Sequence, residues 1–190
     1  MLNKQITSSV DLTKSKIRSK MLLRLKKQKE EDRERKSSAI KEKLFGTVEF
    51  IKARTVMFYI SFGGEVKTRK MISDAQKLGK KIAIPVCDKA GGLRPCLYHK
   101  GLRLVIGPYG VHEPVEKKAI SLEDLDLVIV PGLAFEKNGK RLGRGKAYYD
   151  HFLAKLGKRA PAISLAYDFQ ILPSVPTSPT DIDVDRIIFA

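Results

Sequence analysis

Four glycines and five basic residues gather in the second half of the chain, between residues 132 and 146. They follow the apolar run Leu127–Val130, which predicts a buried strand ending at Pro131-Gly132, and a helical pattern begins near Tyr148. Backbone N–H groups at a helix start, with cations around them, bind phosphate, so the loop is the candidate active site. The loop residues in question are Gly132, Gly139, Gly143, Gly145, Lys137, Lys140, Arg141, Arg144 and Lys146.

Two better-known phosphate motifs do not match this loop. From Gly139 to Lys146 the spacing is one residue too long for GxxxxGK, and Ala147 supplies no hydroxyl for Mg²⁺. Gly143 could open a GxGxxG motif, but its third glycine would fall on Tyr148. A surface turn with solvated lysines is the alternative that composition leaves open.

The N-terminal part of the chain is basic and predicts two helices. Residues 1–12 are polar without a period, and we expect them to form a flexible arm. From Thr13 onward, apolar residues recur at helical spacing up to Leu25, and a second helix is predicted near Glu31–Lys52. The cations of the first helix are either its solvated face or part of a ligand site.

Strand and helix alternate from residue 55 onward. This alternation predicts a single α/β domain over residues 13–190, with a mainly parallel open sheet and helices on both faces in Rossmann-like layers. A helix at Thr68–Leu78 should end at Gly79. The other predicted strands are Thr55–Ser61, Lys81–Val86, Pro161–Tyr167 and Ile187–Phe189, with Leu93–Tyr98 and Leu102–Ile106 as a shorter pair.

Carboxylates near strand ends are further candidates for chemistry. Glu65 lies just beyond the first predicted strand, where open α/β sheets bind ligands, or it complements the start of the next helix. Asp181, Asp183 and Asp185 alternate ahead of the last strand, either as edge protection or as oxygen ligands for a hard cation. His112 has no paired Ser, Cys or carboxylate motif, so an ordinary loop histidine is the favoured interpretation.

Composition narrows the class of protein. The 190 residues contain no long apolar run and no signal-peptide pattern, and the two cysteines form no CxxC motif, so we expect a cytoplasmic protein without a zinc site or disulfide framework. The formal charge is +16, and residues 1–43 hold 14 Lys/Arg against 6 Asp/Glu. Such a balance implies an anionic partner: a nucleotide, an anionic small molecule or a nucleic acid.

The stretch PGLAFEKNGKRLGRGKAYYD at residues 131–150 resembles the motif PGxAFDxxGxRLGxGxGYYD of the 5-formyltetrahydrofolate cyclo-ligases, also called 5,10-methenyltetrahydrofolate synthetases. Three features depart from that family: Glu136 replaces Asp, Ala147 replaces Gly, and a leader precedes the usual start. A methyl group at 147 matters if the backbone there takes a positive φ. The resemblance extends to KSKIR at 14–18, Glu65-Val66-Lys67-Thr68, Gly79-Lys80 before a strand ending in Pro85, Gly110–Pro114, and the tail with Asp181 and Val184-Asp185.

The resemblance implies an ATP- and Mg²⁺-dependent cyclo-ligase that converts 5-formyltetrahydrofolate to 5,10-methenyltetrahydrofolate with release of ADP and phosphate. It implies that Arg144 and Lys146 are catalytic, and that Asp150 and Asp181 bind Mg²⁺. Ile60, Glu65, Arg144 and Tyr148 would bind the folate. The implied ATP contacts are Lys14, Ser15, Lys16, Ile17, Arg18, Arg141, Leu142, Gly143, Arg144, Gly145, Lys146, Ala147, Tyr148 and Tyr149.

The sequence is also compatible with two alternative functions. A nucleic-acid-binding protein would use the basic N-terminal helix, although Tyr148 and Tyr149 are adjacent rather than spread for base stacking and no helix-turn-helix, RRM or zinc pattern occurs. Another ATP-dependent phosphotransferase would use the same loop to bind ATP but would transfer the phosphoryl group to a different small molecule. We expect a monomer that acts on small molecules, without nucleic acid or membrane partners.

Overall fold

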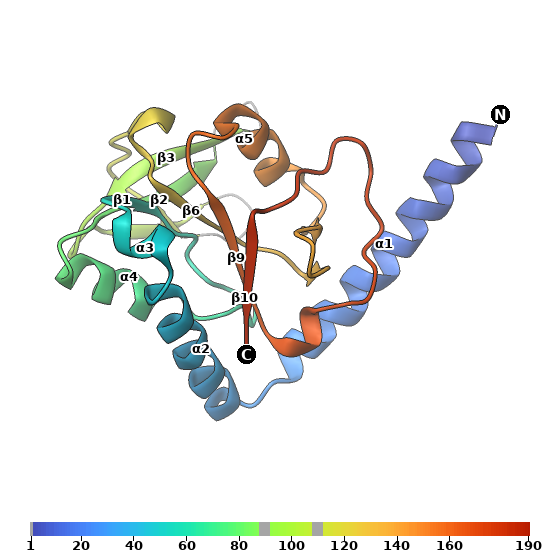
Figure 1. Cartoon of the computed structure of the whole chain (residues 1–190), viewed down its shortest axis with the longest axis horizontal. Helices are drawn as coiled ribbons and strands as arrows, with labels where there is room; N and C mark the ends of the chain where they lie inside the picture. Colours follow the sequence, from blue (N-terminus) through green and yellow to red (C-terminus); the bar gives the residue numbers. More distant parts are fainter. Residues whose placement is uncertain (1, 88–91, 108–111) are drawn as a thin grey trace.

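A six-stranded sheet forms the centre of the computed structural model, which describes residues 2–87, 92–107 and 112–190 (Figure 1). The strand order is β10-β9-β6-β1-β2-β3, and all neighbours are parallel except β2 and β3. This arrangement confirms the predicted α/β class. The strands are β1 (Thr55–Met57), β2 (Lys81–Cys87), β3 (Leu93–Tyr98), β6 (Leu127–Val130), β9 (Ala162–Ala166) and β10 (Arg186–Phe189).

The central strands are buried on both faces, as their continuous apolar sequences predict. Every residue of β1, β6 and β9 is buried. The chain leaves β1 for β2 on one side and later returns to β6 on the other, so the strand order reverses between β1 and β6. The carboxyl ends of strands at such a reversal form the usual ligand crevice of open α/β sheets.

Helices cover both faces of the sheet. One core cluster joins Val56 and Ile129 to apolar side chains of α1, α2, α3 and α4. The other joins Met57 and Val128 to Phe152 and neighbouring residues of α5, because successive strand residues point to opposite faces. The helices are α1 (Leu2–Lys27), α2 (Glu30–Phe45), α3 (Val48–Lys52), α4 (Arg69–Lys77) and α5 (Tyr148–Leu156), with short 3₁₀ turns at Leu122–Asp124 and Asp168–Gln170.

The N-terminal helices differ from the prediction in their bounds. Helix α1 begins at Leu2 rather than Thr13, and its first turns extend past the sheet (Figure 1). The flexibility expected of residues 1–12 stays a prediction. The predicted helix at Glu31–Lys52 is two helices, because Thr47 caps α3: its hydroxyl accepts the Phe50 N–H and donates to the Leu44 carbonyl.

Two strand predictions were wrong in detail. The first strand ends at Met57 instead of Ser61, because the Thr68 hydroxyl bonds the Tyr59 carbonyl and the Ser61 N–H where a strand partner would bond them. The predicted pair does not form either: β3 pairs with β2, while β4 (Leu104–Ile106) pairs with β5 (His112–Pro114). Of the stretch Gly110–Pro114, Gly110 and Val111 lie outside the described residues.

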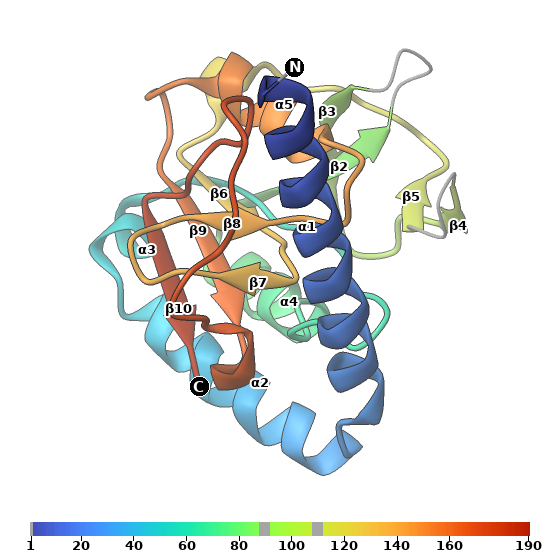
Figure 2. The same ribbon diagram turned by 90° about the vertical axis from the view of Figure 1, so that its right-hand side faces the viewer.

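The basic loop between β6 and α5 contains a hairpin that was not predicted. Strands β7 (Ala134–Phe135) and β8 (Arg141–Leu142) pair antiparallel, and the hairpin lies beside α1 (Figure 2). None of the helices in the described part of the chain has both the length and the apolarity that a membrane span requires.

The loop before α4 packs closely against the end of α1 at Gly64. Gly64 has a φ of +89°, and a Cβ atom there would lie 2.5 Å from the Leu25 carbonyl oxygen. We therefore expect Gly64→Ala to lower the free energy of unfolding by more than about 2 kcal/mol, since left-handed strain and overpacking add. Urea unfolding measures this loss.

Gly79→Ala is the matched control. Gly79 also has a positive φ, +79°, but a Cβ there would meet no atom within 4 Å. Gly79→Ala should therefore lower the free energy of unfolding only by the cost of left-handed backbone strain, about 1 kcal/mol. Equal losses in the two variants would contradict the described contact between the Gly64 loop and α1.

Candidate active site

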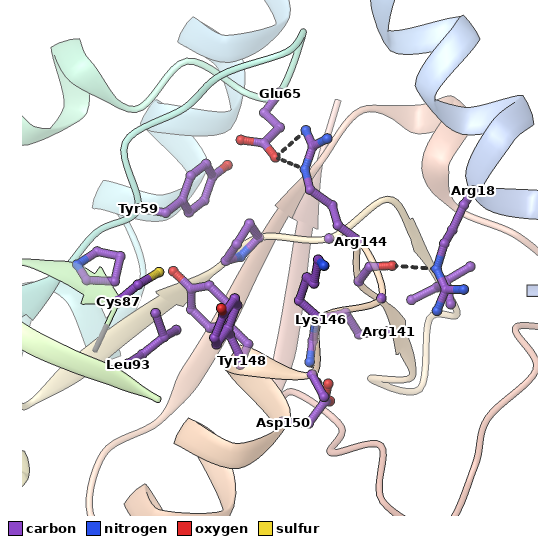
Figure 3. A pocket seen from close by; sticks show the side chains of 18 of the residues that line it. Arg18, Tyr59, Glu65, Cys87, Leu93, Arg141, Arg144, Lys146, Tyr148 and Asp150 are labelled. Carbon is purple, nitrogen blue, oxygen red and sulfur yellow. Dashed lines mark hydrogen bonds and ion pairs between the residues drawn. The ribbon is translucent and has the colours of Figure 1, made fainter. Parts of the chain in front are cut away.

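A cavity of about 410 Å³ opens at the carboxyl ends of β1, β2 and β6 (Figure 3). It lies at the strand-order reversal where a ligand is expected. Its walls come from α1, the loops after β1 and β6, strand β2 and the start of α5. The lining residues are Arg18, Tyr59, Ile60, Phe62, Glu65, Pro85, Cys87, Leu93, Pro131, Gly132, Arg141–Asp150 and Asp181.

The basic loop forms one side of the cavity and α1 holds it in place. The Arg18 Nε donates to the Gly143 carbonyl oxygen at 3.1 Å (Figure 3). Gly145 has a φ of +96°, and a Cβ there would lie 3.3 Å from the Arg18 guanidinium carbon. The glycine therefore lets the cation approach the loop backbone.

Arg141 and Asp150 form a largely buried ion pair at the base of this loop. Their Nη2 and Oδ1 atoms are 2.7 Å apart, and the side chains are 2% and 15% exposed. The same Asp150 oxygen accepts the Ile182 N–H at 3.2 Å. Asp150 thus joins β8, the start of α5 and the C-terminal segment.

Lys14 and Asp181 form a second pair, between α1 and the segment before β10. The Lys14 ammonium, 4% exposed, bonds the Asp181 carboxylate at 2.5 Å and also the Ser178 hydroxyl. Burial acts to raise the pKa of Asp181, but Lys14 and the Ser178 N–H outweigh it and the pKa is lowered. Asp181 is therefore an anion at neutral pH.

Glu65 and Arg144 form a third pair across the cavity (Figure 3). Glu65 is only 5% exposed; its Oε1 accepts from the Arg144 Nη2 at 2.9 Å and Nε at 3.2 Å. The Phe62 N–H donates to Oε2, and the Phe62 ring lies 4.2 Å below the guanidinium. Burial raises the pKa of Glu65, and Arg144 partly offsets that effect.

The opposite side of the cavity is mainly apolar, and the sequence analysis missed most of it. Tyr59, Cys87 and Leu93 lie on this side in Figure 3, away from Arg18. The Tyr149 hydroxyl is buried without a hydrogen-bond partner in the described part of the chain, and burial raises its pKa. The signal that could have identified Tyr59 and Cys87 is their place at or just beyond the carboxyl ends of β1 and β2, and Leu93 pairs with Cys87 from the start of β3.

Known proteins resemble the chain along almost its whole length. The model of the 5-formyltetrahydrofolate cyclo-ligase family matches residues 10–190. The chain belongs to this family. The resemblance seen in the sequence is therefore confirmed, and the protein is an enzyme.

Three known proteins illustrate the similarity in sequence and structure. A 5-formyltetrahydrofolate cyclo-ligase of Mus musculus is 28% identical, with 95% of each chain covered. The structure of an Aquifex aeolicus 5,10-methenyltetrahydrofolate synthetase is 34% identical, with a TM-score of 0.81 over 93% of this chain and 89% of that one. A synthetase from Mycoplasma pneumoniae, 21% identical with a TM-score of 0.75 over 92% and 97%, shows the same fold.

The structure brings most of the predicted cyclo-ligase residues to one cavity. Arg18, Ile60, Glu65, Asp181 and the run from Arg141 to Asp150 all line it. Their individual roles stay predictions.

Other predicted residues lie elsewhere. Ser15 and Lys16 are exposed and do not line the cavity, while Ile17 packs against the core. Lys14 reaches the site through its ion pair with Asp181. His112 lies in β5 outside the cavity lining, and its interpretation as an ordinary loop histidine stays a prediction.

The family departure at Ala147 falls on a strained backbone position. Ala147 precedes α5 with φ +53° and ψ +11°, and it is the only described residue other than glycine with a positive φ. The usual glycine adopts this conformation without strain. The other departure, Glu136, lies outside the cavity lining, where it bonds the Val175 N–H and Asn138.

Ala147→Gly is expected to raise the free energy of unfolding by roughly 0.5–1 kcal/mol. Relief of the left-handed strain at alanine stabilises the fold by about 1–2 kcal/mol, and the larger conformational entropy that glycine loses on folding offsets part of this gain. Ala154→Gly, at an exposed site inside α5, should lower it by about 1 kcal/mol. Urea unfolding of both variants checks the opposite signs. Destabilisation by both would contradict strain at Ala147.

Proposed function

We propose that this enzyme converts 5-formyltetrahydrofolate to 5,10-methenyltetrahydrofolate and, in the same reaction, cleaves ATP to ADP and phosphate. One observation carries the proposal: a single cavity joins a basic glycine-rich loop to a buried carboxylate and an apolar wall. The basic side suits the phosphates of a nucleotide. The apolar side, with Glu65 at its edge, suits a flat heterocycle with polar N–H groups.

The reaction requires activation of a poor leaving group. The formyl oxygen attacks the γ-phosphorus of ATP, and ADP leaves. N10 of the folate then attacks the formyl carbon, the carbon–oxygen bond breaks, phosphate departs with the former formyl oxygen, and N10 loses its proton. Such a transfer depends on positioning and charge stabilisation more than on a covalent side chain.

The cations of the basic side would stabilise the phosphoryl group. Arg144 and Lys146 belong to the loop, and Arg18 reaches it from α1, so these three side chains bring positive charge to the cavity without a covalent nucleophile being needed. Lys14 and Arg141, each paired with a carboxylate, hold the surrounding segments and extend the positive field.

Asp150 and Asp181 would hold Mg²⁺. The two carboxylates line the same cavity, and Mg²⁺ commonly takes one or two protein carboxylates together with phosphate oxygens and water. In the described part of the chain, no group of three or more His, Cys, Asp or Glu side chains could hold a metal. Two carboxylates suit an ion that also takes phosphate oxygens of the nucleotide, and such an ion would neutralise charge on the phosphates.

The alternative functions receive less support. Family membership favours neither nucleic-acid binding nor another phosphotransferase. Much of the positive charge near the cavity is paired with carboxylates of the same chain, which suits a compact anion better than a long backbone. We propose small molecules as the partners and a monomer as the working form.

The proposed function predicts that 5,10-methenyltetrahydrofolate, which has its own near-ultraviolet absorbance band, forms from 5-formyltetrahydrofolate only when ATP and Mg²⁺ are both present. Absorbance and a phosphate assay on the same sample should give equal amounts of methenyl product and phosphate. Chelation of Mg²⁺ with EDTA should stop both signals, and added Mg²⁺ should restore them, because the phosphates would otherwise lack a counter-charge.

Two results would count against the proposal. Phosphate release without the absorbance band would favour a different acceptor and hence another phosphotransferase. Formation of the band at an equal rate without ATP would remove the nucleotide from the reaction.

A further inference from the structure

Arg144 and Glu65 bind each other although they are expected to serve different substrates. Arg144 belongs to the basic loop that suits phosphate, and Glu65 lies beside the wall that suits the folate. Two nitrogens of Arg144 bond the same oxygen of Glu65, at 2.9 and 3.2 Å. The pair therefore spans the boundary between the two halves of the cavity (Figure 3).

The resting place of Arg144 is shaped by its surroundings. Its guanidinium lies 4.2 Å from the centre of the Phe62 ring. At Gly63, a Cβ atom would come within 3.2 Å of the Arg144 Nη2, so the absence of a side chain leaves room for the cation. Stacking, space and ion pair together hold Arg144 towards Glu65.

Glu65 has little capacity left for another ligand. An ionised carboxylate offers about four lone-pair sites, and Arg144 and the Phe62 N–H already use three of them. A heterocycle that donates two adjacent N–H groups needs both carboxylate oxygens. Because Glu65 is 5% exposed, it cannot remain unpaired without a large cost, so one partner must replace the other.

We propose that this pair is an interlock between the two substrates, an inference that rests on the proposed function. The reduced folate replaces Arg144 as the hydrogen-bonding partner of Glu65, and the released Arg144 side chain then binds the nucleotide phosphates. Glu65 is thus a positioning residue for Arg144 as well as a folate ligand. Since the two binding equilibria share this step, each substrate raises the affinity for the other by the same factor.

The interlock has a consequence for ATP consumption. Without folate, Glu65 holds Arg144 away from the phosphates, so the side chain expected to stabilise phosphoryl transfer is withheld. Hydrolysis of ATP without an acceptor is thereby suppressed. Loss of the pair should release Arg144 and raise this unproductive hydrolysis.

The test measures binding of a non-hydrolysable ATP analogue with Mg²⁺ by calorimetry, with and without tetrahydrofolate, which has no formyl group to react. In the wild-type enzyme, tetrahydrofolate should tighten analogue binding by about 5- to 10-fold. ATP hydrolysis without folate is measured in parallel. Neither readout requires turnover of 5-formyltetrahydrofolate.

Two substitutions of Glu65 separate release of Arg144 from a change in the electric field. Glu65→Gln removes the charge, whereas Glu65→Asp keeps it but is one methylene too short to reach Arg144. Both variants should bind the analogue about 3- to 10-fold tighter without folate, lose the effect of tetrahydrofolate and hydrolyse more ATP. Glu136→Gln, a charge removal outside the cavity lining, should leave all three quantities unchanged.

Melting temperatures show whether the Glu65 variants fold. A further variant, Gly63→Ala, tests release of Arg144 while Glu65 stays in place. Gly63→Ala keeps both charges and places a methyl group against the guanidinium in its resting place, so it should also raise unproductive hydrolysis.

Distinct results would overturn the inference. Tetrahydrofolate that binds the wild-type enzyme without changing analogue affinity contradicts the interlock, as does tighter analogue binding in Glu65→Gln but not in Glu65→Asp. No binding of tetrahydrofolate at all would instead contradict the proposed function.

Discussion

Charge neutralisation inside the chain is the constraint on which the site depends. The cavity gathers basic side chains that would repel one another, and three carboxylates from separate segments hold them: Asp181 with Lys14, Asp150 with Arg141, and Glu65 with Arg144. These pairs tie α1, the hairpin, α5 and the C-terminal segment to one another. Because at least one member of each pair is almost fully buried, loss of a single partner would leave a costly charge.

The sequence predicted the location of the basic side of the cavity, for a physical reason. A buried strand, a glycine-rich cationic loop and a helix start form a local unit, so adjacent residues such as Gly143 and Arg144 reveal it without knowledge of the rest. Glu65 could be placed because strand ends meet at one edge of a parallel sheet. Fold class followed from the same alternation of strand and helix.

Features that depend on distant contacts could not be predicted. The first strand ends early because Thr68 bonds the backbone at Tyr59 and Ser61, which no local pattern indicates. The apolar wall combines strand ends and loops that are separate in the sequence. Likewise, spacing on a helix could not show that Arg18 lines the cavity and that Lys14 pairs with Asp181, while Lys16 is exposed to solvent.

In the proposed reaction, this cavity transfers the γ-phosphoryl group of ATP to the formyl oxygen. The most direct test follows the oxygen: 5-formyltetrahydrofolate with ¹⁸O in its formyl group is converted with unlabelled ATP in unlabelled water, and the phosphate is analysed by ³¹P NMR. We expect the label to appear in inorganic phosphate, in proportion to the methenyl product. Unlabelled phosphate alongside full formation of the methenyl product would contradict it.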